Sequence, residues 1–158
     1  MKKIHNPFPP DKNPCFGCSK ENKHGLHLDF HEDGDELVSI WDPQPEYQGF
    51  HNILHGGIQA TIMDEIASWT IFVKEKTAGV TSSMNVKFNK PLFMDIGQVT
   101  VRCKILERQK RIILLEAKMI DANGEVCSEA EINYFTYPLE LAKKKFLYPG
   151  AEEFLDLS

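Results

Sequence analysis

The sequence predicts an α+β domain in which one antiparallel sheet is curled around a single long helix. Two observations support this. One helical stretch is apolar on nearly every side, and the segments around it alternate between apolar and polar residues with a period of two. The expected order is two strands, the long helix and then four strands in a meander. A sheet with one long helix to cover is most economically built as an antiparallel sheet around it.

Residues 1–25 are predicted to form an irregular arm, because they are rich in proline, asparagine, lysine and glycine and show no sustained period. Two short strands follow, Leu26 to His31 and Glu36 to Trp41. The residues between them, Glu32-Asp33-Gly34-Asp35, have the composition of a tight turn, so the two strands are expected to form a hairpin.

The long helix is predicted from Gly57 to about Lys76, where no proline interrupts the chain. A helix that is apolar nearly all round is a buried one. Its exceptions lie three or four residues apart and would form one polar stripe: Thr61, Asp64, Glu65 and Ser68.

After Gly79 the alternation predicts four strands, near residues 84–89, 99–105, 112–120 and 125–136. The sequence Asp121-Ala122-Asn123-Gly124 predicts a hairpin turn, because Asn-Gly tolerates positive φ. A short helix is expected at Leu139 to Leu147. The chain is therefore divided into an arm over 1–25, a domain over 26–137 and a carboxy-terminal extension over 138–158.

Composition narrows the class of protein. A chain of 158 residues fits one domain, and its formal charge of −5 argues against a nucleic-acid partner. No apolar run approaches the roughly 18 residues that span a bilayer, and no apolar stretch follows Lys2-Lys3 as in a secretory signal. We therefore expect a cytoplasmic protein with no membrane partner, whose four cysteines are thiols.

The first candidate for chemistry is His55-Gly56-Gly57, directly before the predicted helix. A glycine pair lets a substrate approach the backbone closely and leaves the first helical N–H groups free to donate. With the positive end of the helix dipole behind them, these donors can hold a carbonyl oxygen as it becomes negative. The alternative is that the glycines only shape the junction between loop and helix.

The second candidate is the acidic pair Asp64 and Glu65 in the middle of the apolar helix. A carboxylate on such a surface must meet a cation, a hydrogen-bond network or a wet site, and a catalytic cleft supplies the last. The alternative is a structural ion pair with Arg102 or Lys87.

Together these features resemble a known family. The stretch Gln48-Gly49-Phe50-His51-Asn52-Ile53-Leu54-His55-Gly56-Gly57-Ile58-Gln59-Ala60-Thr61-Ile62-Met63-Asp64-Glu65 resembles the signature of hotdog-fold thioesterases of the phenylacetate-pathway type. Cys15-Phe16-Gly17-Cys18, with Asn22 and Gly25-Leu26, is similar to their amino-terminal motif, and Ser83 to Pro91 is similar to the strand after their helix. The resemblance covers about residues 14 to 136 and implies a hotdog fold, with five to six strands around the helix.

The resemblance also implies roles for single residues. Asp64 would be the base or nucleophile, the Gly57 amide would polarise the thioester carbonyl, His55 would shape the loop with Gly56, and the neighbouring Glu65 would be secondary. Hotdog thioesterases act on acyl-CoA or similar thioesters as dimers, or dimers of dimers, in which loop and acid come from different subunits. Neither a cofactor nor a metal is implied.

One position departs from the pattern of the family. Many relatives carry Asn or Gln six residues before the histidine to hold the attacking water, whereas this chain has Gly49 there. Gln48 and Asn52 are the nearby substitutes. A hydroxyl at the start of the next strand often assists, and the sequence offers three: Thr81, Ser82 and Ser83. The departure keeps a non-catalytic acyl-CoA-binding module open as the alternative, ahead of a hotdog dehydratase.

The cysteine pair near the amino terminus has two interpretations. Cys15 and Cys18 with His24 and His27 offer sulfur and imidazole, the ligands that zinc prefers. The interval between the two pairs is shorter than in zinc fingers, and His27 falls in a predicted strand. We therefore expect structural thiols that pack the arm.

Overall fold

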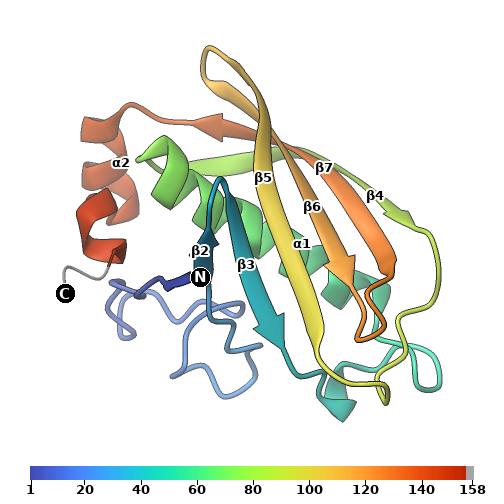
Figure 1. Cartoon of the computed structure of the whole chain (residues 1–158). Coiled ribbons are helices and arrows are strands. Elements are labelled where there is room, and N and C mark those ends of the chain that lie inside the picture. The colour runs from blue at the N-terminus through green and yellow to red at the C-terminus, as the bar shows by residue number, and fades with distance from the viewer. Residues whose placement is uncertain (156–158) are drawn as a thin grey trace.

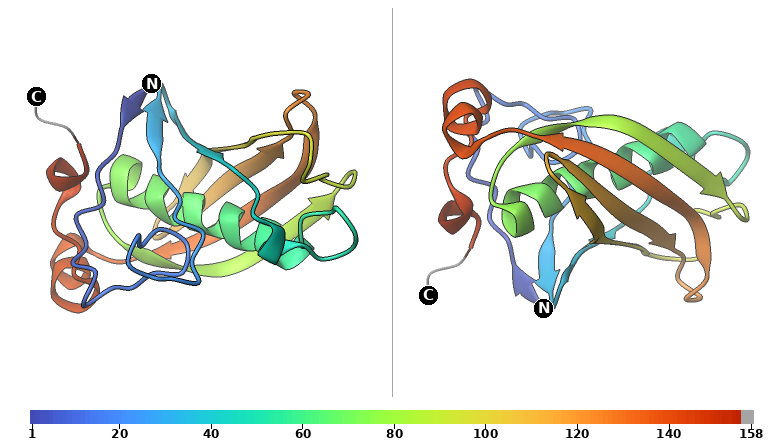
Figure 2. Two further views of the ribbon diagram at one scale, coloured as in Figure 1. Left: turned by 90° about the horizontal axis from the view of Figure 1, so that it is seen from below. Right: turned by 90° about the horizontal axis from the view of Figure 1, so that it is seen from above.

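The computed structural model describes residues 1–155, and its long helix lies across the concave face of one curved sheet (Figure 1). The helix α1 spans Gly56–Thr70 and continues as a π-helical segment over Ile71–Glu75. It ends where Lys76 adopts a left-handed conformation with φ of 59°. The two views in Figure 2 show α1 along the sheet from below and from above. The predicted helix and α+β class are confirmed.

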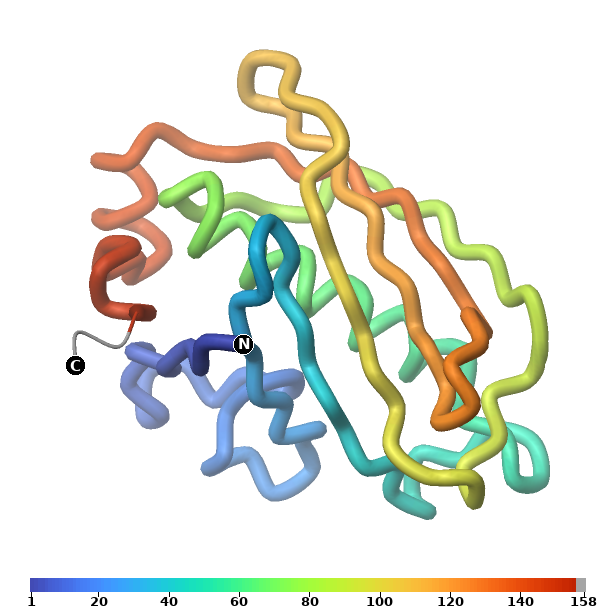
Figure 3. The backbone as a smooth tube through the Cα atoms, viewed as in Figure 1, coloured from blue at the N-terminus to red at the C-terminus, as the bar shows by residue number. Residues whose placement is uncertain are grey.

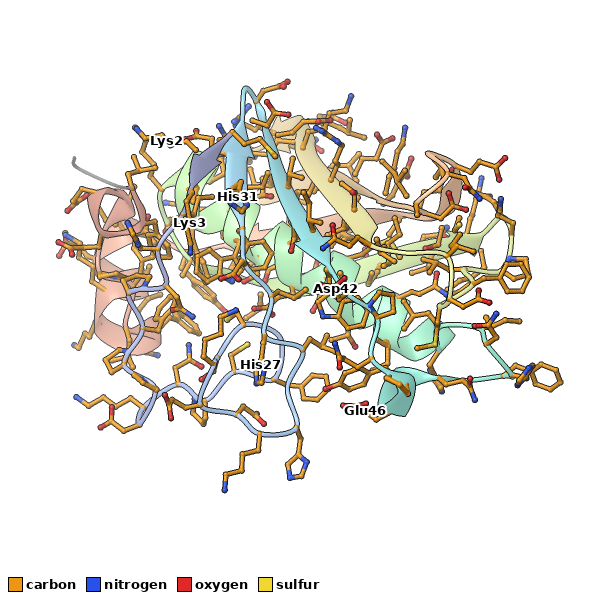
Figure 4. The ribbon with its side chains drawn as sticks, turned by 60° about the horizontal axis from the view of Figure 1, so that its bottom comes forward. Lys2, Lys3, His27, His31, Asp42 and Glu46 are labelled. Atoms are coloured by element: carbon orange, nitrogen blue, oxygen red, sulfur yellow. The ribbon has the colours of Figure 1, made fainter. Side chains whose placement is uncertain are left out.

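Within residues 1–155 the sheet has seven antiparallel strands in the order β1-β2-β3-β5-β6-β7-β4. Five to six were expected, and β1 is a two-residue strand inside the predicted irregular arm. The bounds are β1 (Lys2–Lys3), β2 (His31–Asp33), β3 (Glu36–Trp41), β4 (Gly79–Phe88), β5 (Val99–Gln109), β6 (Ile112–Ile120) and β7 (Val126–Thr136). Figure 4 labels Lys2 and Lys3 on β1 beside His31 on β2.

The predicted four-strand meander is wrong in one respect. Strands β5, β6 and β7 form a meander, but β4 pairs with β7 at the far edge of the sheet, and β5 pairs with β3. The helix α1 begins beside β7, where the Gln59 side chain contacts Ser128. Its π-helical continuation ends beside the β2–β3 turn, where Lys74 binds Glu32. The chain then pairs with the free edge of β7 as β4, and the connection over residues 89–98 leads to β5.

The predicted strand from Leu26 to His31 is also wrong, because β2 begins only at His31. The chain before it packs with alternating burial but joins no strand of the sheet. The Leu26 and Leu28 amides instead donate to the carbonyls of Phe16 and Gly17, at 2.8 and 2.9 Å. The backbone bonds that a hairpin would need are therefore used by the arm, which lies beside this segment.

Both predicted turns lie where the glycines need positive φ. The β2–β3 turn is shorter than expected, at Gly34 and Asp35, and Gly34 has φ of 64°. The turn between β6 and β7 is confirmed at residues 121–124, with Gly124 at φ of 82°. The Asp121 side chain accepts from the Asn123 and Glu125 amides, which closes that turn.

The core lies between α1 and the sheet and extends to both ends of the chain. Ile62, Met63, Ile66 and Ala67 on α1 are at most 1% exposed, as are Leu115 and Ile132 on the strands that they face. The carboxy-terminal extension contains the expected short helix, α2 (Leu139–Phe146), and a 3-10 turn, η3 (Ala151–Phe154). Figure 3 shows the two ends of the chain side by side, where the His5 amide donates to the carbonyl of Phe154.

No helix in the part of the chain that the structure describes is long and apolar enough to cross a membrane.

Candidate active site

The loop before α1 is held by the residue that caps the helix. The His55 Nδ1 accepts from the Gly57 amide at 2.9 Å, and the His55 carbonyl accepts from the Gln59 amide at 3.0 Å. Within residues 1–155 the Gly56 and Ile58 amides have no described acceptor, as expected for the first turn of a helix. The Gly-Gly segment therefore presents N–H groups at the positive end of the helix dipole.

A buried glutamine fixes this loop to the sheet. Gln59 is 3% exposed; its Nε2 donates to the Leu54 carbonyl at 2.9 Å, and its Oε1 accepts from the Ser128 hydroxyl at 2.8 Å. Sequence reasoning missed Gln59 as a functional candidate. The available signal was a lone amide side chain among apolar helical residues directly after the glycine pair.

Asp64 lies two turns along α1, half-buried, and meets the start of β4. Its Oδ1 accepts from the Thr81 hydroxyl at 2.5 Å. The alternative of an ion pair with Arg102 is wrong, because Arg102 instead binds Asp33 and Glu36, at 3.1 and 2.7 Å. No lysine or arginine within residues 1–155 pairs with Asp64, which leaves a carboxylate neutralised by no cation.

Tyr134 on β7 lies beside this carboxylate and was not expected from the sequence. Burial raises the pKa of Tyr134 to about 12; the Ser68 side chain opposes the shift through a hydrogen bond, and the charge of Asp64 adds to it. The phenol is therefore protonated at neutral pH. Tyr134 has the same parity along β7 as the buried residues Ala130 and Ile132, which is the signal that could have placed it on the inner face.

The predicted polar stripe on α1 divides between two surroundings. Asp64 and Ser68 face β4 and β7, whereas Glu65 faces the amino-terminal arm. The Glu65 Oε1 accepts from Trp69 Nε1 at 3.2 Å and from the Cys15 thiol at 3.3 Å. Adjacent helical positions differ by about 100° in direction, so the two neighbouring acids lie in different environments.

The structure separates the three candidate hydroxyls of β4. Thr81 contacts Asp64, whereas the Ser82 hydroxyl donates to the carbonyl of Asn133 at 3.0 Å. Ser83 accepts from the Asn133 side-chain amide, also at 3.0 Å. An irregularity in the pairing with β7 falls between Thr81 and Ser83, and both serines are exposed. Only Thr81 is brought to the acid.

The position that departs from the family pattern is tightly packed. A Cβ added at Gly49 would lie 2.9 Å from the Cα of His55, so a side chain there requires the backbone to move. The Gln48 Oε1 accepts from the Asn52 amide at 2.8 Å, which joins the two candidate substitutes to each other. Asn52 has φ of 55°, a conformation that asparagine tolerates.

An open hollow of about 280 Å³ lies at the amino-terminal end of α1. It brings together Gln48, His55 and Gly57 from the predicted set, but not Asn52 or Asp64. Apolar atoms line it more than polar ones, and the remaining lining residues are Glu46, Tyr47, Ile58 and Thr61. The geometry combines N–H donors with an apolar surface, as an acyl group next to a polarised carbonyl would need.

The two histidines considered as zinc ligands do not join the cysteines. His27 Nε2 contacts the Asn22 carbonyl at 2.6 Å, and the ring borders a hollow with Asp42 and Glu46, all three labelled in Figure 4. The described group of potential metal ligands contains Cys15 and Cys18 with Glu65 instead.

Comparison with known proteins places this geometry in a family. Residues 51–128 match the thioesterase superfamily. A candidate esterase of Saccharolobus solfataricus is 29% identical over 86 residues, which cover 54% of this chain and 56% of that protein. The chain thus spans about half the length of this curated relative.

Solved structures share the fold at low sequence identity. The PaaI protein of the phenylacetic acid degradation operon of Escherichia coli has a TM-score of 0.64 and 16% identity, covering 72% of this chain and 81% of that one. A hypothetical thioesterase of Streptococcus pneumoniae, solved with coenzyme A, has a TM-score of 0.65 and 15% identity, covering 71% and 87%. The sheet curled around α1 is the hotdog fold, and the segment of this chain that carries the candidate loop, Asp64 and Thr81 matches the thioesterase superfamily.

Proposed function

We propose that this protein hydrolyses an acyl thioester, with acyl-CoA as the substrate class. The observation that carries the proposal is the state of Asp64. It is a half-buried carboxylate in the middle of an apolar helix, hydrogen-bonded to Thr81 and paired with no cation among residues 1–155. A partly buried carboxylate without a cation lowers the stability of the fold unless water or a substrate can reach it. Its presence therefore supports an active site at this position.

Asp64 would act as the general base or as the nucleophile. The Thr81 hydroxyl occupies Oδ1, and Oδ2 has no described partner within residues 1–155, so it can take a proton from water. The resulting hydroxide attacks the carbonyl carbon, the C–S bond of the tetrahedral intermediate breaks, and the thiol leaves with a proton. In the nucleophilic alternative the carboxylate attacks the carbonyl carbon, the C–S bond breaks and the thiolate leaves as a mixed anhydride forms, and water then hydrolyses the anhydride to the free acid and restores Asp64.

The negative oxygen of the intermediate would be held at the first turn of α1. The Gly57 amide is the proposed donor, assisted by the helix dipole. In the structure this amide donates to His55 Nδ1 at 2.9 Å, so the substrate oxygen would take over a hydrogen bond that the ring now accepts. The exchange replaces one acceptor by another and leaves no buried donor unpaired.

A second copy of the chain would complete the site. Gly57 and Asp64 are seven residues apart on one helix, a separation of about 10 Å along its axis. Both groups cannot reach one carbonyl from the same subunit. Strand β4, which carries Thr81, is a ten-residue edge strand with Val80 and Phe88 exposed at 42% and 54%. We propose a homodimer, alone or paired into a tetramer, formed along this edge.

Coenzyme A as the leaving thiol is supported by the Streptococcus pneumoniae neighbour, whose structure contains that molecule. The hollow beside His55 would receive the acyl group, because Tyr47 and Ile58 give it an apolar lining. This places the carbonyl next to the Gly57 amide.

One observation favours a second candidate, a non-catalytic acyl-CoA-binding module. Gly49 has no side chain to hold a water molecule, and the close approach of His55 leaves no space for a side chain at this position. A binding module would keep the hollow and the N–H groups of α1 but would not turn the thioester over.

The test is thiol release from a panel of acyl-CoAs that are short, long, branched and aromatic. We expect turnover of at least one member and a loss of about 10³-fold or more in kcat for Asp64→Asn, within the range for removal of a general base. The matched control is Asp35→Asn, an exposed aspartate in the β2–β3 turn, which should retain activity. Tight binding without turnover would favour the binding module, and full activity of Asp64→Asn would exclude the assigned role.

A further inference from the structure

Three side chains that the proposed reaction does not use meet where the amino-terminal arm crosses α1. Cys15, Cys18 and Glu65 each offer one donor atom, and the three atoms lie within 4.8 Å of one another. We propose that these residues form a binding site for a thiophilic divalent cation, of which zinc is the natural probe. The site would hold the arm on the helix, a role independent of the proposed activity.

The turn that carries the cysteines brings the Cys15 sulfur against helix α1. The Ser19 amide donates to the Cys15 carbonyl at 3.0 Å, which closes the turn. The Cys15 Sγ lies 3.3 Å from the Glu65 Oε1, so a sulfur donor and an oxygen donor already face each other. Cysteine binds a metal as the thiolate, so metal binding would replace the thiol proton that Glu65 now accepts.

The Glu65 carboxylate is not paired with a cation, because no lysine or arginine among residues 1–155 forms an ion pair with it. Lys20, the lysine nearest to the two cysteines in sequence, is engaged elsewhere: its Nζ contacts Asp29 at 3.0 Å and the His27 carbonyl at 2.6 Å. A divalent cation bound by the carboxylate and two thiolates would offset two of their three negative charges, and its binding would release two thiol protons to solvent.

The donor set suits zinc in type and in separation. Thiolates at about 2.3 Å and a carboxylate oxygen at about 2.0 Å in tetrahedral geometry lie about 3.5 to 4 Å from one another. That separation is inside the observed limit of 4.8 Å, so the ligands need little movement. Water would supply the fourth ligand; a hollow of about 180 Å³ borders Cys18, with Lys3, Lys20 and Asn6 among its other lining residues.

The backbone around the cluster is fitted to the carboxylate. A Cβ added at Gly17 would lie 2.5 Å from the Cδ of Glu65, so the arm can approach the helix this closely only with glycine between the cysteines. Trp69 Nε1 donates to the Glu65 Oε1 at 3.2 Å, which orients the carboxylate from the helix side. An outer hydrogen bond of this kind is typical of carboxylate ligands.

The experiment is a titration of the reduced, chelator-treated full-length protein with Co²⁺, followed by displacement with Zn²⁺. We expect one equivalent to bind with sulfur-to-cobalt charge-transfer absorption in the near ultraviolet. Cys15→Ser and Cys18→Ser should each weaken binding by more than about 100-fold, beyond the loss usual for an outer hydrogen-bond partner. Glu65→Gln, which keeps the side-chain shape, should weaken binding without removing the sulfur absorption.

The matched control is Cys127→Ser. Cys127 is also a buried thiol beside a carboxylate, with its Sγ 3.5 Å from Asp121 Oδ2, but it has no second sulfur in that contact. This variant should bind cobalt as the unchanged protein does. If a cysteine variant in the arm fails to fold by circular dichroism, Glu65→Gln and a zinc-dependent rise in the Tm of the unchanged protein carry the test.

Two outcomes would overturn the proposal. One is absence of charge-transfer absorption in the reduced protein, including the case in which Cys15 and Cys18 are found only as a disulfide. The other is cobalt binding that persists in the Cys15→Ser and Cys18→Ser variants. Neither outcome depends on thioester hydrolysis, so failure here and failure of the proposed function are distinguishable.

Discussion

The two ends of helix α1 are built for different purposes. At its amino-terminal end, His55 and Gly57 are exposed beside an open hollow, and the first turn is held by a side-chain cap. At its carboxy-terminal end, Trp69 is 2% exposed and stacks on Phe30 with ring centroids 4.7 Å apart. One helix thus carries open N–H donors at one end and closely packed aromatic rings at the other.

The difference shows how the chain separates stability from chemistry. The aromatic cluster takes Phe8 and Phe30 from the arm side and Tyr148 and Phe154 from the extension, all outside the residues that match the family. The exposed loop, Asp64 and Thr81 lie inside that match. The two terminal segments therefore stabilise the half of the helix that is remote from the candidate site.

The strongest way to test this separation is Phe154→Ala. Phe154 is 0% exposed and contacts the rings of Trp69 and Phe72, each with a centroid distance of 5.4 Å. We expect a loss of about 3 kcal/mol in the free energy of unfolding, the low end for a buried aromatic residue, because chain near an end can partly collapse into the cavity. Chemical denaturation measures the change in the free energy of unfolding. The control is Phe50→Ala, because Phe50 is 79% exposed and its removal should cost little stability.

If the aromatic cluster and the candidate site are independent, kcat of the folded Phe154→Ala variant should stay within about twofold of that of the unchanged protein. Distant sites with no shared partners usually behave independently. A fall in kcat that parallels the fall in stability would show that the two ends of α1 are coupled.

A smaller effect is expected where the open end is fastened to the sheet. Gln59→Leu keeps the approximate size of the side chain but leaves the Leu54 carbonyl and the Ser128 hydroxyl without their partner. Leaving buried polar groups unpaired should lower the free energy of unfolding by about 2 kcal/mol. Adding Ser128→Ala should recover part of this loss, because the double variant removes one of the two unpaired groups. A loss in the double variant equal to the sum of the single losses would argue against the network.

Local pattern was enough to predict the elements but not all of their pairings. The apolar stretch over 57–76 and the Asn-Gly turn at residues 123–124 are features of adjacent residues, and both predictions are confirmed. The pairing of β4 with β7 joins segments that are far apart in the sequence, which no local period encodes. The segment from Leu26 was mistaken for a strand because its alternation is real, while its hydrogen bonds go to the arm.

The same distinction applies to the candidate site. Asp64 and the glycine pair are visible in sequence because an acid inside an apolar helix and two adjacent glycines are locally unusual. Tyr134 lies 70 residues from Asp64, and only the sheet brings them together. Likewise, the sequence offered three adjacent hydroxyls as equivalent candidates, and the strand geometry directs one of them to the acid.

That choice between hydroxyls is the finest test of the proposed site. Thr81→Val keeps the branched shape of the side chain and removes the hydrogen bond to Asp64, so we expect kcat to fall about tenfold, equivalent to about 1.4 kcal/mol. Thr81→Ser retains a hydroxyl and should recover most of that loss. Ser83→Ala should lower kcat by less than Thr81→Val does, because its hydroxyl contacts Asn133 on the outer side. Measurement of kcat and KM by thiol release decides the matter, since an equal or larger effect at Ser83 would move the supporting hydroxyl away from Thr81.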